Sequence, residues 1–261
     1  MLRLTRFAAA SLALLLALSP ARARAQADDR PVVAVLYFDN RAFGKAAADY
    51  ENFGKGVADL LITDLAEAGR VRVVERDRIQ AILAEQDLIK AGSIDQATAV
   101  KIGKLVGAQY VIMGSFITSP RDEIVLTSRT VDLETSVISN PQKVQSKGDD
   151  VLALVADLSS RLQRDLKLPT KAVGGGDTGA HQSGGEKRGT EDRRVTPSGP
   201  GSSKKQARMD VRTSLLYAKA LDEQDRGNDE RATELYRAVL TRVPDYAPAK
   251  AKLAKLEKAR S

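Results

Sequence analysis

One stretch of this 261-residue chain limits its fold more than any other, because it cannot contribute to a hydrophobic core. Residues 169–207 are dominated by glycine, serine, threonine and charged side chains, including the run GGGDTGAHQSGGEKRGTEDRR. Such a segment buries too little apolar surface to offset the entropy that ordering would cost. We therefore expect a disordered linker between two folded parts, residues 28–168 and residues 208–261.

The first folded part switches repeatedly between strand and helix patterns. Strand-like runs at Val32–Phe38 and at residues 71–75 are each followed by apolar residues at helical spacing, and Gly69 stands where the first helix should end. Residues 41–52 are expected to form a polar loop. Three strand patterns and one helix pattern complete the order β-α-β-α-α-β-β-β-α. This order predicts an α/β fold, a mixed sheet with helices packed on it.

The second folded part is helical throughout, with a turn at Gly227–Asn228 and a break at Pro244. Small residues at Ala220 and Ala232 and an aromatic at Tyr236 make it resemble one tetratricopeptide repeat with a capping helix. Such repeats bury their apolar faces against neighbours. A single one should therefore dock on a partner, on a second copy or on the α/β domain. A plain helical hairpin is the alternative interpretation.

The N-terminus has the pattern of a cleavable secretory signal peptide. Arg3 and Arg6 precede an apolar run at residues 7–18, and small residues then offer a cleavage site after Ala25. The run is shorter than the ~20 residues of a membrane-spanning helix, although an uncleaved anchor is the alternative. The chain contains no cysteine, so no lipoprotein anchor is expected. We predict residues 1–25 as signal peptide and a periplasmic location.

Removal of the signal peptide weakens the basic character of the chain. The formal net charge is +7, and the predicted signal peptide carries four of the arginines and no acidic residue. About +3 would remain, without the clustering that nucleic acids require. No nucleic acid is therefore expected among the partners.

A polar joint, Glu75–Arg76–Asp77, lies between the second strand pattern and the helix that follows it. Asp77 has the residue type of an N-cap, and Gln80 stands three residues later, as in a capping box. Glu75 and Arg76 have no nucleophile, histidine or metal partner nearby in the sequence, which favours a structural ion pair or an interface contact. The predicted interface or structural residues are Glu75, Arg76, Asp77, Gln80, Glu85, Tyr217 and Tyr236.

The sequence offers no constellation for catalysis. The single histidine, His181, lies in the expected linker, which excludes a Ser-His-Asp set and a zinc site built from histidine and cysteine. The glycine-rich FGKG around Gly54 lacks the Ser or Thr that follows the lysine of a phosphate loop. The acid pairs Asp132/Glu134 and Asp149/Asp150 fit solvated carboxylates better than a glycosidase dyad. We predict no catalytic, cofactor-binding or metal-binding residue, and no cofactor.

Two segments, VVERDRIQAILAEQDL and KIGKLVGAQYVIMGSF, resemble the CsgG/HfaB family of curli-type production and assembly components of the bacterial envelope. The resemblance covers about Pro31 to Leu166. It implies an α/β domain that makes protein contacts and assembles into rings, without chemistry of its own. The chain departs from the family's secretion pore in two ways. It has no cysteine to acylate, and it lacks the long alternating hairpins with aromatic girdles that build a transmembrane barrel.

These observations favour a non-enzymatic periplasmic assembly or scaffold protein that acts by self-association and partner binding. The expected partners are envelope proteins or a second copy of the chain, in an outer-membrane-associated complex, and no small-molecule substrate is inferred. The alternatives are a component of an outer-membrane secretion pore, an activator of a cell-wall synthase and, in a different class, an enzyme acting on cell-wall material.

Overall fold

The computed structural model describes residues 28–42, 45–85, 94–119, 121, 123–138, 141–166 and 207–259. The predicted signal peptide and nearly all of the predicted linker lie outside these residues. The elements are, in order, β1 (Val32–Asn40), a 3₁₀ helix (Lys45–Tyr50), α1 (Phe53–Ala68), β2 (Arg72–Val73), α2 (Arg76–Glu85), α3 (Gln96–Val106), β3 (Tyr110–Thr118), β4 (Ile124–Asp132), β5 (Gln142–Ser146), α4 (Val151–Asp165), α5 (Val211–Asp225), α6 (Asp229–Arg242) and α7 (Ala247–Ala259). Within the described ranges, no helix is long and apolar enough to span a membrane.

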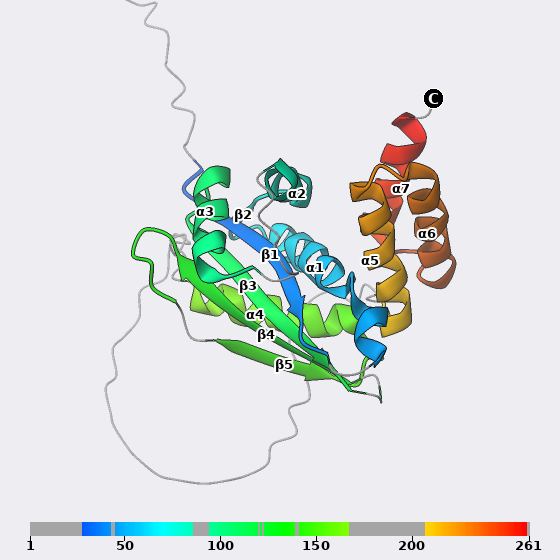
Figure 1. Ribbon diagram of the computed structural model, residues 1–261, viewed down its shortest axis with the longest axis horizontal. Helices are drawn as coiled ribbons and strands as arrows, with labels where there is room; N and C mark the ends of the chain where they lie inside the picture. Colours follow the sequence, from blue (N-terminus) through cyan, green and yellow to red (C-terminus); the bar gives the residue numbers. More distant parts are fainter. Residues whose placement is uncertain are drawn as a thin grey trace, which may run out of the picture.

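The five strands form one mixed sheet in the order β2-β1-β3-β4-β5 (Figure 1). β1 runs parallel to β2 and β3, whereas β4 is antiparallel to both β3 and β5. The parallel pairs are joined through helices, and the antiparallel strands follow each other directly along the chain, as the connection rules require. The prediction of an α/β fold with a mixed sheet is confirmed.

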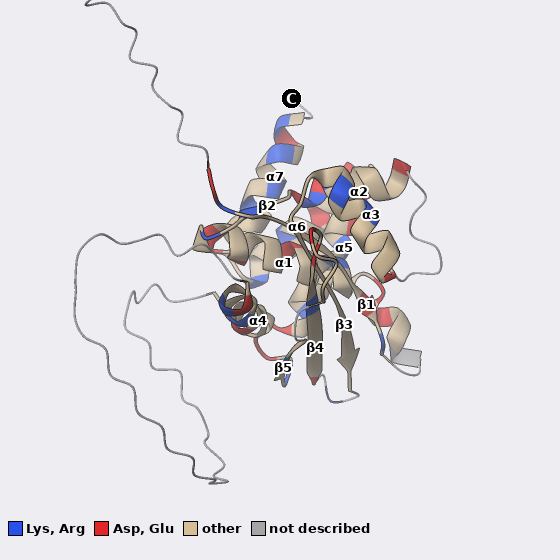
Figure 2. Ribbon diagram, turned by 90° about the vertical axis from the view of Figure 1, so that its left-hand side faces the viewer, with Lys and Arg blue, Asp and Glu red and all other residues tan. Residues whose placement is uncertain are grey.

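Helices cover both faces of the sheet (Figure 2). On β1, Val33 and Val35 belong to the core formed with α1 and α4, whereas Ala34 and Leu36 belong to a second core under α2 and α3. This division follows from the strand period of two, which sends successive side chains to opposite faces. The second core extends only to part of β3 and to Val131 of β4.

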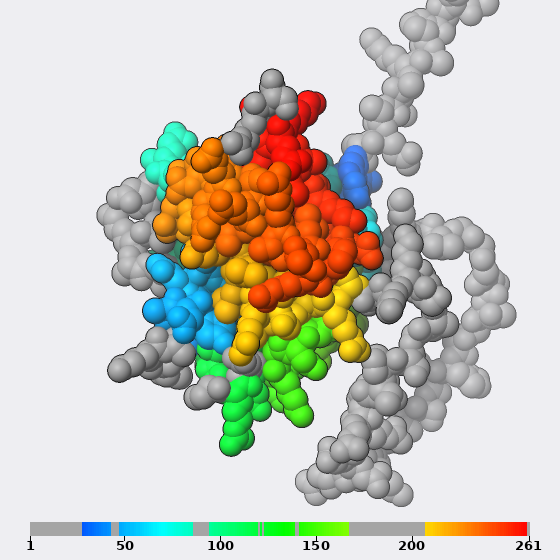
Figure 3. Space-filling model, turned by 90° about the vertical axis from the view of Figure 1, so that its right-hand side faces the viewer, coloured from blue at the N-terminus to red at the C-terminus, as the bar shows by residue number. Residues whose placement is uncertain are grey.

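The C-terminal helices α5–α7 pack beside α1 at one side of the α/β domain (Figures 1 and 3). Tyr217 and Leu221 of α5 share one continuous apolar core with Leu61 and Leu65 of α1. A short backbone contact also ties the two parts together, because Val151 N–H donates to the carbonyl of Met209 and Val211 N–H to that of Gly148. The helical segment is therefore docked on the α/β domain.

The structure differs from the sequence expectations at two places. Residues 41–52 were expected to form a polar loop, but a 3₁₀ helix covers Lys45–Tyr50, because the Tyr50 ring packs edge-on against Phe53 at 5.9 Å and joins the core. The strand expected at residues 71–75 is reduced to Arg72–Val73, which pairs only with β1 at the edge of the sheet.

Candidate interaction site

Arg76, at the first position of α2, lies at the centre of the contact between the two folded parts. Its side chain is only 3% exposed. Nη1 lies 2.7 Å from Oδ1 of Asp225 on α5, Nε lies 3.3 Å from Oδ1 of Asp59 on α1, and Nη2 lies 3.1 Å from Oδ1 of Asp77. One guanidinium therefore links three helices, and one of these belongs to the C-terminal segment.

Two lysines also pair with carboxylates at this junction. Lys55 Nζ on α1 lies 2.7 Å from Asp222 and 3.1 Å from Asp225, and Lys252 Nζ on α7 lies 3.1 Å from Asp59. The three carboxylates are 5–7% exposed, so each negative charge is buried and paired. We call this set the buried charge cluster; its members are Lys55, Asp59, Arg76, Asp222, Asp225 and Lys252.

The electrostatics of the cluster keep Arg76 charged. Burial acts to lower the pKa of Arg76, but the nearby Asp225, Tyr37 and Asp59 outweigh it and hold that pKa above its ordinary value. Buried ion pairs gain little net stability, because desolvation offsets their attraction, whereas removal of one partner is costly. The cluster therefore fixes how the C-terminal helices sit on the α/β domain.

Three tyrosines from the C-terminal segment pack beside the cluster. Tyr217, fully buried, donates from its hydroxyl to Oδ2 of Asp59 at 2.5 Å, and its ring meets the rings of Tyr236 and Tyr246 edge-on at 5.9 and 5.3 Å. Tyr236 donates to Oε1 of Gln224 at 2.8 Å. Burial is the largest cause of a raised pKa for all three hydroxyls. They remain neutral at physiological pH and act as hydrogen-bonding and packing groups.

The structure brings several of the predicted residues to this junction. Arg76, Tyr217 and Tyr236 lie in or beside the buried charge cluster, and Gln80 accepts a hydrogen bond from the Tyr37 hydroxyl at 2.5 Å. Glu75, directly before α2, and Glu85, the last residue of α2, have exposed side chains that lie outside the junction. The carbonyl of Glu75 accepts hydrogen bonds from the N–H groups of Arg78 and Ile79. Glu75 therefore contributes to the start of α2 through its backbone.

The prediction that Asp77 is the N-cap of α2 is wrong. The helix begins at Arg76, so Asp77 lies inside the first turn. Its carboxylate instead meets Arg76 and, 3.1 Å away, Lys255 of α7. Burial acts to raise the pKa of Asp77, but the Lys255 hydrogen bond and the charge of Arg76 outweigh it and leave that pKa below its usual range.

Sequence reasoning missed Lys55, Asp59, Asp222, Asp225 and Lys252. One signal was available, because Asp222 lies directly beside the buried Leu221 on α5 and Asp225 follows one helical turn later. Acids on the apolar side of a helix are rarely buried without a cation. The pattern therefore indicates that a cation pairs with these carboxylates, although it does not identify the residue that provides it.

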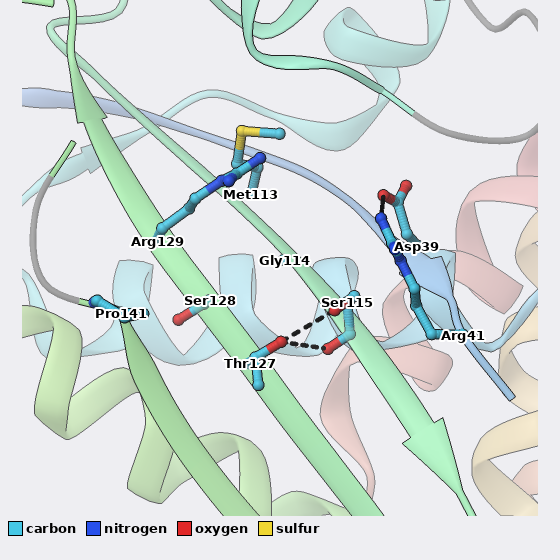
Figure 4. A pocket seen from close by; sticks show the side chains of 9 residues that line it. All are labelled: Asp39, Arg41, Met113, Gly114, Ser115, Thr127, Ser128, Arg129 and Pro141. Atoms are coloured by element: carbon cyan, nitrogen blue, oxygen red, sulfur yellow. Dashed lines mark hydrogen bonds and ion pairs between the residues drawn. The ribbon is translucent and has the colours of Figure 1, made fainter. Parts of the chain in front are cut away.

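A second polar feature is a hollow on the sheet face that α2 and α3 leave uncovered, with a volume of about 220 Å³. Arg41 and Arg129 stand on either side of it, and the hydroxyls of Ser115 and Thr127 lie 2.9 Å apart at its floor (Figure 4). Neither this hollow nor the junction resembles a metal site. Among the described residues, no group of three His, Cys, Asp or Glu side chains is placed to hold a metal ion.

Close contact between α1 and α5 gives a direct test of the docking. A Cβ atom added at Gly56 would lie 2.9 Å from Cβ of Ala218. At an open helical site, glycine to alanine would stabilise the protein by about 0.5–1 kcal/mol. At this site we expect Gly56→Ala to destabilise it instead, by about 1–2 kcal/mol in the free energy of unfolding measured with urea, because the helices must move apart.

The matched variant for this test moves the methyl group from one helix to the other. In the double variant Gly56→Ala/Ala218→Gly, the new methyl group occupies the space that the old one leaves, so most of the loss should be recovered. Stabilisation by Gly56→Ala alone would show that α1 and α5 do not pack closely in solution.

Comparisons with known proteins place the first half of the chain near one family. Residues 16–119, less than half of the chain, match the family model described as the curli production assembly/transport component CsgG, which supports the resemblance noted from the sequence. The part of the resemblance that concerns a tetratricopeptide repeat remains a prediction. No curated protein sequence matches the chain significantly.

Several solved structures align with the fold. The C-terminal domain of LpoB from Salmonella enterica is 21% identical, with 44% of this chain and 82% of that chain aligned at a TM-score of 0.33. Lipoprotein GNA1162 from Neisseria meningitidis is 14% identical, with 52% and 99% aligned and a TM-score of 0.39. A PelC dodecamer from Paraburkholderia phytofirmans is 15% identical, with 54% and 90% aligned and a TM-score of 0.34. All three TM-scores are below 0.5, and nothing about function follows from them.

Proposed function

We propose that the chain is a non-enzymatic protein of the bacterial envelope that works by binding other polypeptides as an assembly or scaffold component. The observation that carries this proposal is the match of residues 16–119 to the CsgG family model, whose description is production, assembly and transport. The geometry of the junction supports it, because the carboxylates of the buried charge cluster are each paired with cations. Groups held in this way position helices and are not available to attack a substrate.

The proposal includes a domain organisation. Residues 1–25 act as a cleavable signal peptide that delivers the chain to the periplasm, residues 28–168 form the CsgG-like domain, and residues 169–207 link it to the tetratricopeptide-like segment at 208–261. Docking of that segment on α1 enlarges the surface of the α/β domain by the outer sides of α5–α7 (Figure 3). Partner proteins would then meet both parts as one rigid surface.

Site-specific photo-crosslinking in intact cells tests this function. A photoreactive amino acid is placed at Leu105 of α3, which is 47% exposed, or at Ile117 of β3, which is 42% exposed. The matched control position is Leu61, which is fully buried in α1. We expect a discrete crosslinked product from an exposed position, containing an envelope protein or a second copy of the chain, and none from Leu61.

The result also separates the more specific roles. Crosslinks to secretion components indicate an export system, and crosslinks to a cell-wall synthase indicate an activator. A chain that stays monomeric and yields no crosslinked partner from either exposed position would contradict the proposal. Turnover of cell-wall glycan by the purified chain, abolished by a change of one acidic side chain, would contradict it as well.

A further inference from the structure

The half of the sheet face that α2 and α3 do not cover carries hydroxyl, apolar and cationic side chains. Residues on β3, β4 and β5 alternate, so that Phe116, Leu126 and Val144 are buried on the α1 and α4 side while their neighbours point the other way. We call these outward residues the open sheet face; they are Ser115, Ile117, Val125, Thr127, Arg129 and Lys143. Ile117 is 42% exposed, and the side chains of Arg129 and Lys143 are also exposed.

The strand register arranges the open sheet face in rows. Ile117 pairs with Val125, which gives an apolar row. Ser115 pairs with Thr127, which pairs in turn with Lys143, so two hydroxyls and an ammonium group lie side by side. Residues two apart on a strand lie about 6.6 Å from each other, so an extended segment that runs along the strands places every second residue over a successive row.

The charges on this face are predominantly positive. Arg41 borders the hollow just after the end of β1, and Arg129 stands on its opposite side (Figure 4). Lys143 lies on β5. The acid in the hollow is Asp39, which is 16% exposed and 3.8 Å from Arg41. Among the described residues, the side chains of Arg129 and Lys143 have no ion-pair partner. The face therefore presents cations to solvent beside an apolar row.

A second copy of the chain does not fit this face by a two-fold contact. A symmetric dimer places the same patch on both sides of the interface. Arg129 and Lys143 would then face Arg129 and Lys143, and like charges across an interface are disfavoured. A partner of opposite charge meets no such penalty.

We propose that the open sheet face binds an extended acidic segment of a partner polypeptide. The carboxylates of the segment pair with Arg41, Arg129 and Lys143, and its apolar residues lie on Ile117 and Val125. The backbone and side-chain amides of the segment have Ser115 and Thr127 as hydrogen-bonding groups. This inference rests on the proposed function, because it names a surface and a partner chemistry for a protein that acts by binding polypeptides.

A labelled peptide that repeats Glu-Ser-Val-Ser is the probe, because glutamate and valine then alternate along one side of the extended chain. Its binding to the full exported chain is followed by fluorescence anisotropy. Matched peptides carry glutamine or lysine in place of glutamate. We expect the glutamate peptide to bind at least ~10-fold more tightly than the glutamine peptide, and the lysine peptide not to bind. The affinity for the glutamate peptide should fall as salt is added, because these charges are exposed to solvent.

Charge reversals locate the site. Arg129→Glu and Lys143→Glu should each raise the Kd for the glutamate peptide at least ~10-fold. The matched control is Arg164→Glu, an exposed position on α4, which packs on the other face of the sheet. It changes the net charge equally and should leave the Kd within ~2-fold. Far-UV circular dichroism checks that all three variants are folded.

Two results would overturn this inference. The first is equal binding of the glutamate and glutamine peptides, and the second is an equal loss of affinity in Arg129→Glu and Arg164→Glu. In-cell crosslinking distinguishes such a failure from a failure of the proposed function. If partners still crosslink to Arg129→Glu as they do to the unchanged chain, the chain binds polypeptides by another surface. If the unchanged chain crosslinks to nothing, the proposed function itself is wrong.

Discussion

Replacement of Arg76 by methionine is expected to lower the free energy of unfolding by about 3–5 kcal/mol. Methionine keeps much of the volume of the side chain but removes the charge that faces Asp59 and Asp225. Loss of the cation leaves buried carboxylates without enough positive charge nearby to offset their desolvation. This costs far more stability than the loss of an exposed ion pair. Urea unfolding followed by circular dichroism measures the difference.

The same variant should also loosen the C-terminal segment, because Asp225 belongs to α5 and Asp59 to α1. The chain contains no cysteine, so spin labels attach only at introduced positions. Lys101→Cys on α3 and Thr241→Cys on α6 are both exposed. We expect one narrow distance distribution between these labels in the unchanged chain and a broad one in Arg76→Met.

Two companion variants separate charge from volume. In Arg76→Met/Asp225→Leu one charge of each sign is removed, while Lys55 keeps Asp222 and Lys252 keeps Asp59. Much of the lost stability should return, because well-packed apolar residues replace buried ion pairs at little cost. Arg164→Met, at an exposed site, should change stability by less than about 0.5 kcal/mol. A loss below about 1 kcal/mol in Arg76→Met, with the label distances unchanged, would show that the cluster does not hold the segment in place.

The element order of the α/β domain is predictable because its signals are local. The β-branched run at Val32–Phe38 and the helical stripe that follows it need only neighbours in sequence to be recognised. Gly69 and Gly107 adopt the left-handed conformation, with φ of 66° and 71°, at the helix ends where glycine is expected. Gly69 therefore stops α1 as the sequence indicates, and Gly107 stops α3 in the same way.

The charge cluster is less predictable because its contacts are long-range. Arg76 stands out as a polar residue at a strand–helix joint, but its partner Asp225 lies 149 residues away, beyond the predicted linker. The capping interpretation of Asp77 failed for the same reason. Local rules predict that the Asp77 carboxylate accepts a hydrogen bond from nearby backbone. It instead accepts one from Lys255, 178 residues later in the sequence. Only packing of α7 near α2 reveals this pairing.

Alkaline pH is expected to destabilise the protein sharply through four tyrosines. Burial is the largest cause of a raised pKa for Tyr37, Tyr217, Tyr236 and Tyr246. In the unfolded chain the same hydroxyls ionise near pH 10. Below about pH 9 both states keep these protons and stability is unaffected. Above pH 10 the unfolded state releases them while the folded state retains them, so stability falls as pH rises.

The size of this effect follows from proton linkage. At a pH well above the pKa of the unfolded chain, each proton that only the folded state retains lowers the free energy of unfolding by about 1.4 kcal/mol per pH unit. Because these hydroxyls are only half ionised at pH 10 in the unfolded chain, the fall between pH 10 and pH 11 is about 1 kcal/mol per tyrosine and about 4 kcal/mol for four. This is a large share of the total stability of many domains. Urea unfolding at pH 8, 9, 10 and 11 measures the fall, and neutral-pH samples returned from pH 11 check that it is reversible.

Phenylalanine variants assign the effect to individual hydroxyls. Tyr246→Phe removes one ionisable group, so the fall in stability between pH 10 and pH 11 should shrink by about 1 kcal/mol, one quarter of the total. Tyr217→Phe should shrink it by a similar amount, but it also loses the hydrogen bond to Asp59 and should start from a lower stability at pH 8. An equal fall in the unchanged chain and in Tyr246→Phe would mean that this hydroxyl ionises as readily in the folded protein as in the unfolded chain. The tyrosine packing between α5, α6 and α1 would then be open to water, and the tight docking of the C-terminal segment would be contradicted.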